Sequence, residues 1–422
     1  MTEVADADRA IGVEAYASSG PPCAARAKSS EEDFRVEELV SGPGAIKEPR
    51  EGYYPLYRVE KRAIDTMHME RELSDILKSR VSYGGLKDKR AVAVQYVTPT
   101  SLRSERPEAI IREKFTATLL GFVPRPLSKG SVTGNRFEVV LRDCCEEVGG
   151  LVEDVFGLAE EMKVPSFYGL QRFGSRRAGT HTLGRALVKG KFEEAVRLML
   201  TEARSGDDED TRLAKEAMAN GRYGEGWKLL PAHQDVEKRV ARRLSQKPGD
   251  WVGALRAVPI RLRRLYTQAY QSFIFNRTLS LALKRGLDIS KSEDGDNWSE
   301  SRDGGFTLSP VHGVREPRTD SAFPMVQIPG FAYRNYGSRF DSCVEEVMSQ
   351  EEVSAREFYV REMQEASAEG GFRVAHMAFR DGRFEVDGTT ATLRFTLARG
   401  QYATVLLREI IKPTDPKASG LA

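Results

Sequence analysis

The clearest pattern in the chain is a period-two alternation of apolar and polar residues in three separate segments. Val92, Val94 and Tyr96 repeat in this way, and so do the apolar residues of 137–141 and 393–397. Successive side chains of a strand point to opposite faces of its sheet. Each segment is therefore predicted to be a strand with one buried face.

Apolar residues with helical spacing occur in 151–163, 192–202 and 266–284, and each segment is predicted to be a helix. The tract 290–319, rich in Asp, Gly, Ser and Arg, is predicted to form loops. These signals do not alternate as regularly as in a parallel doubly wound sheet, so the predicted class is α+β. Strand signals lie near both ends of the chain, so we expect the two ends to share one sheet, with the middle inserted.

Composition narrows the class of protein. The chain has 422 residues, of which 40% are hydrophobic and 30% charged, as in a globular protein with room for two domains. The apolar runs are far shorter than a membrane span, and residues 1–27 lack the pattern of a signal peptide, so we expect a cytoplasmic location. The four cysteines form no Cys-x-x-Cys pair and the five histidines are scattered, which argues against a zinc-dependent deaminase.

Charge is unevenly distributed along the chain although the net charge is only +2. Two segments, 171–190 and 251–287, have no acidic residue, whereas acidic residues concentrate in 207–210 and 345–369. This segregation predicts a basic wall that binds RNA phosphates and an acidic back, with an ordinary solvated face as the alternative. The cations of the two segments are Arg172, Arg176, Arg177, Arg185, Lys189, Arg256, Arg261, Arg263, Arg264, Arg277, Lys284 and Arg285.

Aromatic residues accompany these basic segments, and exposed rings could stack on bases. The rings are those of Phe167, Tyr168, Phe173, Tyr266 and Tyr270. Some of them are expected to belong to the core instead.

The candidate chemistry lies in the turn before the strand that begins near Val92. Asp88 is the carboxylate of this turn, and its neighbours should keep it ionised and attract a polyanion. Gly84 and Gly85 are expected to allow a sharp turn through backbone angles closed to other residues. A solvated hairpin turn is the simpler alternative. The neighbouring cations are Lys87, Lys89 and Arg90.

The sequence GGLKDKRAVAVQ at 84–95 resembles the signature around the catalytic aspartate of the TruD family of pseudouridine synthases. Four further segments resemble the family's motifs in the same order, so the resemblance extends from residue 28 to residue 409. They are KSSEEDFRVE at 28–37, GNRF at 134–137, VPSFYGLQRFG at 164–174, and GQYAT at 400–404 followed by RE at 408–409.

The resemblance implies a role for four residues. Asp88 would be the catalytic carboxylate, acting as a nucleophile or as a base at the 2′ position. Lys28 would be its basic partner, Asn135 would contact the site, and Phe137 would stack on the target uracil. The alternatives for the last three are a surface lysine, a turn cap and core packing.

The implied reaction is isomerisation of uridine to pseudouridine in tRNA, at position 13, without a cofactor, a metal ion or a protein partner. A non-catalytic RNA-binding or RNA-folding protein on the same scaffold is the alternative. Such a protein would have no chemical need for Asp88, so the presence of Asp88 with Lys28, Asn135 and Phe137 favours the enzyme. An RNA methyltransferase would need a glycine-rich nucleotide loop, which the sequence lacks.

The resemblance also implies a fold in which a largely antiparallel mixed sheet flanked by helices forms the pseudouridine synthase core. Residues 1–163 and 341–422 would form this core, and 164–340 an inserted α+β domain that recognises RNA. The predicted RNA-binding residues lie on both sides of the intervening cleft. They are Lys87, Lys89, Arg90, Arg172, Arg261, Arg263 and Arg264.

Overall fold

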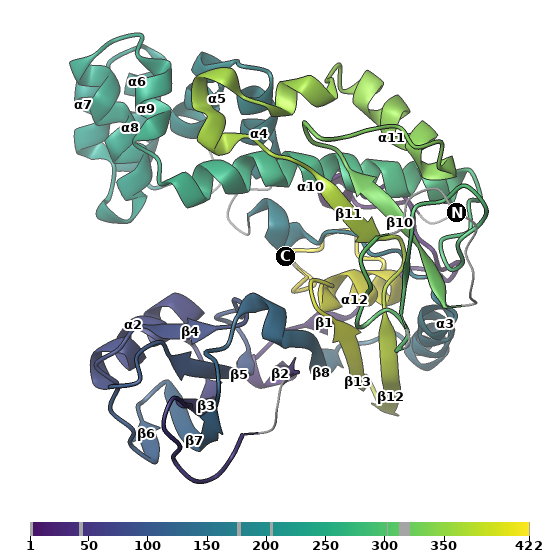
Figure 1. The fold of residues 1–422 in the computed structure, drawn as a ribbon. Coiled ribbons are helices and arrows are strands. Elements are labelled where there is room, and N and C mark those ends of the chain that lie inside the picture. Colours follow the sequence, from purple (N-terminus) through teal and green to yellow (C-terminus); the bar gives the residue numbers. More distant parts are fainter. Residues whose placement is uncertain are drawn as a thin grey trace.

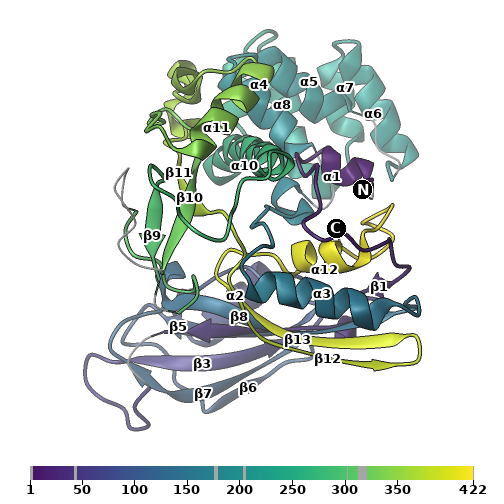
Figure 2. The same cartoon turned by 90° about the vertical axis from the view of Figure 1, so that its right-hand side faces the viewer.

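The structure, a computed structural model, describes residues 3–41, 45–174, 179–202, 206–301, 303–311 and 321–421. In this part of the chain, a 10-stranded sheet forms the base of the molecule and helices lie above it (Figures 1 and 2). A separate 3-stranded sheet joins β9 (Trp298–Glu300), β10 (Ala322–Ile328) and β11 (Gly371–Val374).

The strand order of the large sheet is β12-β13-β8-β2-β5-β3-β7-β6, with β1 paired to β8 and β4 paired to β5. Among these described strands, β2 and β5 are parallel and the other pairs are antiparallel. The predicted mixed, largely antiparallel sheet is confirmed. The strands are β1 (Arg26–Ala27), β2 (Phe34–Val40), β3 (Tyr54–Lys61), β4 (Val81–Tyr83), β5 (Val92–Pro99), β6 (Ala109–Ile111), β7 (Phe115–Val123), β8 (Val132–Arg142), β12 (Phe379–Asp387) and β13 (Thr390–Ala398).

The two ends of the chain share this sheet, as expected. β13 lies beside β8, with Phe395 opposite Phe137. The helices α3 (Val148–Glu160) and α12 (Ala403–Ile411) cover the inner face of these strands (Figure 2). Apolar side chains of β8, β13 and the helices form one large core, because the period-two pattern directs one face of these two strands toward the helices. The prediction of a single buried face is wrong for β5, since residues 92–95 are all buried.

A smaller lobe forms around β3, β4, β5 and β7, which are covered by α2 (Thr66–Ile76). Asp65 caps the start of this helix, and its carboxylate accepts hydrogen bonds from the backbone N–H groups of Met67 and His68. Met69 and Leu73 on the buried face of α2 pack in a separate apolar cluster of this lobe. The lobe is therefore positioned by the sheet but has a core of its own.

A group of helices forms the opposite side of the molecule (Figure 1). The 25-residue helix α10 runs from this group back to the large core. The other helices of the group share an apolar cluster. They are α4 (Thr180–Val188), α5 (Phe192–Thr201), α6 (Glu209–Ala219), α7 (Tyr223–Leu229), α8 (Asp235–Gln246) and α9 (Trp251–Arg256), and α10 spans Ile260–Lys284.

The division of the chain at residue 340 stays a prediction. Contacts continue across this position, since β10 pairs with β11 and α11 (Arg339–Gln350) packs against α10. Val360 and Met363 belong to the apolar cluster of the helical group.

The predicted elements differ from the observed ones mainly at their ends. The predicted helices 151–163 and 266–284 correspond to α3 and α10, which begin earlier in the chain. Residues 290–319 contain the short strand β9, which was predicted as loop, while 302 and 312–320 lie outside the described residues. No helix in the described ranges is long and apolar enough to cross a membrane.

A disulfide between Cys23 and Cys145 joins the segment before β1 to the loop after β8. The two residues are separated by 122 positions in the sequence, and their Cα atoms are 5.5 Å apart. Cys144 and Cys343 are buried and unpaired. The sequence did not predict this pairing, because spacing alone does not show which cysteines meet.

Candidate active site

Asp88 lies in the loop between β4 and β5, and one of its oxygens is held by two donors. The Oδ2 atom accepts hydrogen bonds from Lys28 Nζ at 2.9 Å and from Gln171 Nε2 at 2.6 Å. Within the described part of the chain, Oδ1 has no hydrogen-bond partner. The Asp88 side chain is 38% exposed, so Oδ1 is the oxygen available to a substrate.

Lys28 is buried beside Asp88. Its side chain is only 7% exposed, and its Nζ lies 4.4 Å from the centroid of the Phe34 ring. The backbone of Lys28 has a φ of 56°, which is uncommon for a residue other than glycine. A buried ammonium needs a partner, and the Asp88 carboxylate and the Phe34 ring provide it. Lys28 is therefore not the ordinary surface lysine that was considered as the alternative.

The backbone of the Asp88 loop is held by a second buried lysine. Lys61 Nζ donates hydrogen bonds to the carbonyl oxygens of Ile64 and Asp88, each at 2.8 Å. Burial lowers the pKa of Lys61 to about 8. Lys61 thus fixes the main chain of the residue whose side chain lies in the site.

Lys87 has a structural role in this loop. Its Nζ forms an ion pair with the fully buried carboxylate of Glu38 at 2.7 Å, and its backbone N–H donates to Thr66 Oγ1. The ammonium of Lys87 is therefore directed into the protein, so the predicted RNA contact has no support from the geometry. Lys89 and Arg90, the next cations, are exposed.

The reason for glycine at position 84 differs from the expected one. Neither Gly84 nor Gly85 has a left-handed φ. A Cβ atom at Gly84 would lie 2.1 Å from Val132 Cγ2, so the position excludes any side chain. Close packing of the loop against β8, and not a special backbone angle, requires this glycine.

Asn135 and Phe137 lie on β8 and line the same pocket as Asp88. Asn135 Oδ1 is buried and has no hydrogen-bond partner among the residues that the structure describes. Phe137 is 7% exposed, is stacked on Phe395 with 5.4 Å between ring centroids, and makes an edge contact with Phe34. The ring is therefore a core residue that also borders the pocket. This Asn135 amide oxygen can accept a hydrogen bond from a further donor at the pocket.

The pocket has a volume of about 260 Å³, and all five segments that carry the family resemblance contribute to it or to the Asp88 contacts. Gln171 comes from the short helix η3 (Leu170–Phe173), and Gln401 and Tyr402 precede α12. The sequence did not predict a role in the site for any of these three residues. The only signal for them was their position within matched motifs.

The other predicted RNA-binding residues have different environments. Arg172 Nε donates to Ser272 Oγ at 3.2 Å, and its guanidinium lies 5.8 Å from the Tyr168 ring centroid. Arg261 is exposed at the start of α10. Arg264 is exposed and donates to the main-chain oxygen of Glu365.

Arg263 is 8% exposed, and its guanidinium binds the Val258 carbonyl and the Glu365 carboxylate. These internal partners leave this guanidinium little opportunity to bind RNA, which argues against the predicted contact.

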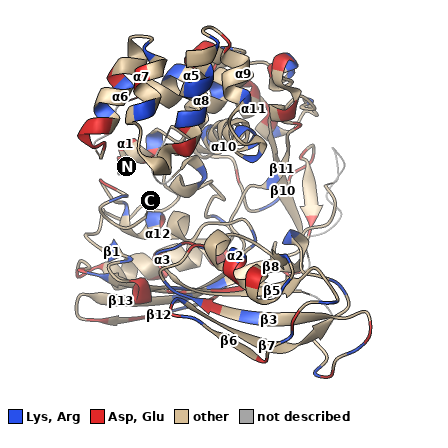
Figure 3. Cartoon of the chain, turned by 90° about the vertical axis from the view of Figure 1, so that its left-hand side faces the viewer, with Lys and Arg blue, Asp and Glu red and all other residues tan. Residues whose placement is uncertain are grey.

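The expected separation into a basic wall and an acidic back is wrong for α10. Three of the five cations of α10 pair with carboxylates from distant segments, because α10 packs against the acidic stretch of the chain. Lys and Arg are interspersed with Asp and Glu over helices α5–α8 as well (Figure 3). The pairs are Arg263 with Glu365, Arg277 with Glu14 and Glu351, Lys284 with Glu14, and Arg285 with Glu346, and Arg256 of α9 also pairs with Glu365.

The second acid-free segment behaves similarly, since Arg185 pairs with Glu351 and Lys189 with Glu352. Arg176 and Arg177 lie outside the described residues. Of the aromatic residues in these segments, Phe167, Phe173 and Tyr270 are fully buried and belong to the core. A segment without acidic residues is thus not by itself a basic surface.

A mixed sheet that holds a lysine-paired aspartate beside an open pocket has the features expected of a pseudouridine synthase. Comparison with solved structures agrees with this class. The crystal structure of a putative tRNA pseudouridine synthase D from Methanosarcina mazei matches with a TM-score of 0.81 and 26% sequence identity, over 98% of this chain and 99% of that chain.

Sequence comparison then identifies the family. A family model described as "tRNA pseudouridine synthase D (TruD)" matches residues 10–410. A probable tRNA pseudouridine synthase D from Pyrobaculum arsenaticum is 33% identical over the full length of both chains. Another from Methanosarcina barkeri is 29% identical over 98% of this chain and 99% of the relative. The chain belongs to the TruD family of tRNA pseudouridine synthases.

Proposed function

We propose that this protein isomerises uridine to pseudouridine at position 13 of tRNA, with Asp88 as the catalytic carboxylate. The observation that carries the proposal is the geometry of Asp88. Lys28 and Gln171 hold Oδ2, and Oδ1 is left for the substrate. Membership of the family supports tRNA as the substrate class.

The reaction breaks the C1′–N1 bond, rotates the uracil and joins C1′ to C5. The proton at C5 is lost and N1 gains one, so the reaction is a net isomerisation that needs no oxidant or reductant. Asp88 acts either as the nucleophile or as the base at the 2′ position, and both roles require an ionised carboxylate. The ammonium of Lys28 orients the carboxylate through a charge-assisted hydrogen bond to Oδ2.

The uracil would be held by β8. The unpaired Oδ1 of Asn135 is suited to accept a hydrogen bond from the base. Phe137 borders the pocket and offers a ring on which the base can stack. A base leaves its stack at a cost of a few kcal/mol, and stacking on an aromatic ring returns about 1–3 kcal/mol.

Recognition of the tRNA shape is proposed for the inserted region, residues 164–340. Support comes from the helical group, which has its own apolar cluster and lies opposite the lobe that carries α2 (Figure 1). Gln171 of this region reaches Asp88, so RNA binding there could influence the catalytic carboxylate directly. The cytoplasm remains the proposed location.

The decisive experiment replaces Asp88 by Asn. Pseudouridine formation in a tRNA transcript should fall by several orders of magnitude, because the change removes the charge that either role requires. Affinity for tRNA and the melting temperature should stay close to wild type. Asp154→Asn, which changes an exposed carboxylate on α3, is the matched control.

Two outcomes would contradict the proposal. Activity of Asp88→Asn near that of wild type would remove Asp88 from the chemistry. A wild-type protein that binds tRNA but forms no pseudouridine would favour the non-catalytic alternative. Mapping the product on transcripts with uridine or cytidine at position 13 tests the site of modification.

A further inference from the structure

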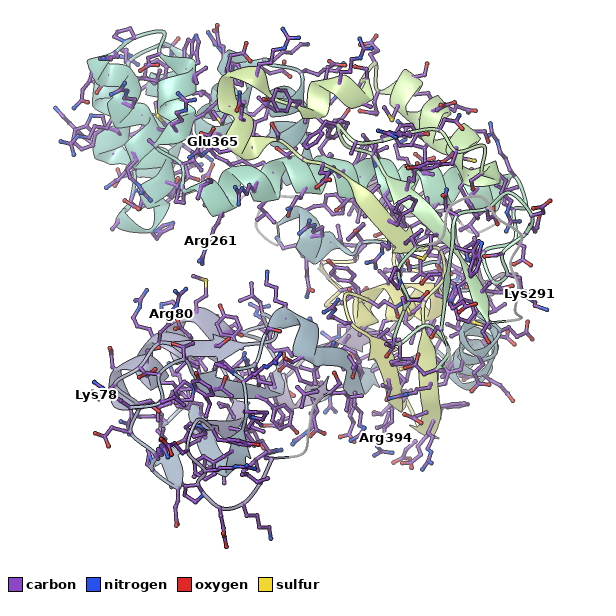
Figure 4. All side chains as sticks on the ribbon, viewed as in Figure 1. Lys78, Arg80, Arg261, Lys291, Glu365 and Arg394 are labelled. Carbon is purple, nitrogen blue, oxygen red and sulfur yellow. A yellow bond between two sulfur atoms is a disulfide. The ribbon has the colours of Figure 1, made fainter. Side chains whose placement is uncertain are left out.

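A second pocket, of about 530 Å³, lies between the lobe that carries α2 and the start of α10. One wall consists of α2, β4 and the residues between them, and Arg261 of α10 contributes from the other side. In Figure 4, Arg261 points from the helical group toward Arg80 of the opposite lobe. The pocket is thus bordered by the lobe that carries α2 and by the start of α10.

This pocket carries an excess of positive charge. Arg71, Lys78, Arg80 and Arg261 line it with only two carboxylates, those of Glu70 and Asp75. All four cations are exposed, and none forms an ion pair within the ranges that the structure describes. The contrast with the paired arginines of α10 is clear, because those arginines have carboxylate partners from other segments.

The position of Arg261 is unfavourable for the helix itself. Arg261 lies in the first turn of α10, where the helix dipole repels a cation, and this turn contains no acidic residue. Arg261 also faces a like charge on Arg80 across the pocket. An anion between the two guanidinium groups would remove both disadvantages.

The strand β4 connects this pocket with the active site. Val81 and Tyr83 line the second pocket, and the next residue, Gly84, lines the pocket of Asp88. A strand rises about 3.3 Å per residue, so Val81 and Gly84, which line one pocket each, lie roughly 10 Å apart along the chain. An RNA strand that delivers a uridine to Asp88 can therefore place a neighbouring phosphate in the second pocket.

We propose that Arg80 and Arg261 form a clamp for one backbone phosphate of the RNA strand that flanks the target uridine, with Arg71 and Lys78 as flanking cations. This inference rests on the proposed function, because it assumes that RNA enters the Asp88 pocket. Guanidinium groups bind phosphate oxygens through paired N–H donors. The shared phosphate connects Arg80 of the lobe that carries α2 with Arg261 of α10. Its negative charge also reduces the repulsion between the two arginines.

The test measures tRNA affinity at several salt concentrations for Arg80→Ala, Arg261→Ala and the double variant. Each single change should weaken binding several-fold and reduce the logarithmic salt slope by about 0.7 to 0.9, the value of one phosphate contact. The double variant should lose little more than either single variant, because both arginines bind the same phosphate. Arg80→Lys and Arg261→Lys should keep most of the slope.

Lys291→Ala is the matched control, since it removes one exposed positive charge far from the pocket (Figure 4). If Arg80→Ala and Arg261→Ala bind tRNA like Lys291→Ala, the pocket does not hold RNA. If the two effects add fully, the arginines bind different phosphates and the clamp is wrong. Pseudouridine formation by the wild type is measured separately. Its absence, with the binding pattern above, would reject the proposed chemistry and leave the clamp standing.

Discussion

Lys61 holds the main chain of the Asp88 loop. Replacing it tests whether the position of this loop matters more for the reaction rate than for the stability of the fold. Its Nζ donates to the carbonyl oxygens of Ile64 and Asp88 at 2.8 Å and, over a longer distance of 3.4 Å, to that of Lys87, and it does not line the pocket of Asp88. In Lys61→Met, these carbonyls lose their donor while the aliphatic volume remains. The variant therefore disturbs the position of Asp88 without removing any group that meets the substrate.

The expected change in the free energy of unfolding is small because two effects oppose each other. An unsatisfied buried carbonyl costs about 1–3 kcal/mol, and the two carbonyls that Lys61 holds at 2.8 Å lose their donor. A pKa lowered from 10.5 to about 8 means that keeping the ammonium charged in the fold costs about 3 kcal/mol, which the methionine avoids. The net change should lie within about 3 kcal/mol of zero.

Catalysis should respond more strongly. A displacement of a catalytic group by 1 Å can reduce the rate about 100-fold. Single-turnover pseudouridine formation with saturating enzyme should therefore fall by about two orders of magnitude in Lys61→Met. Lys114→Met, an exposed lysine of the same lobe, is the control and should retain the wild-type rate.

The pH dependence of stability provides a second readout. The folded pKa of Lys61 lies below its value in the unfolded chain. Between about pH 8 and pH 10.5 the unfolded chain therefore binds more protons, and the Lys61 contribution to stability rises with pH. Below pH 8 this contribution is constant. Urea unfolding from pH 7 to pH 10 should show the rise in wild type and Lys114→Met but not in Lys61→Met.

The reasoning would be refuted if Lys61→Met were fully active, because the Asp88 carbonyl would then need no anchor. It would also fail if the variant were unfolded, because the cost of burying the charge would have been overestimated.

Three further predictions concern single side chains. Gln171→Leu should lower the single-turnover rate by releasing one of the two donors on Asp88 Oδ2 while tRNA affinity changes little; an unchanged rate would mean that Lys28 alone orients the carboxylate. Phe137→Leu should keep the melting temperature near wild type and raise the activation barrier by about 1–3 kcal/mol through lost stacking, whereas a large fall in melting temperature alone would support the purely structural role. Cys23→Ser should lower the free energy of unfolding by about 5 kcal/mol, as expected for a disulfide that closes so long a loop. Reductant should lower the free energy of unfolding of the wild type by the same amount and leave that of the variant unchanged. A wild type whose stability does not respond to reductant would contradict this.

The local elements and the family follow from the sequence alone. The strands β5, β8 and β13 follow from an alternation that depends only on neighbouring residues, and α5 and α10 follow from helical spacing. Asp88 was found because its turn lies among five motifs in a fixed order. The mixed sheet shared by both ends of the chain was predicted from the positions of strand signals and from the same resemblance.

The pairing of charged and polar groups, in contrast, depends on the tertiary fold. The partners of Asp88 are 60 and 83 positions away in the sequence, and Arg263 and Glu365 are separated by 102. An interaction over such a distance depends on how helices and strands pack, which local pattern does not encode. The acid-free segment 251–287 was therefore predicted to form a basic wall, although most of its cations have carboxylate partners in the fold. For the same reason, the sequence does not show that Arg80 and Arg261 line one pocket, because they come from parts of the chain that only the fold brings together.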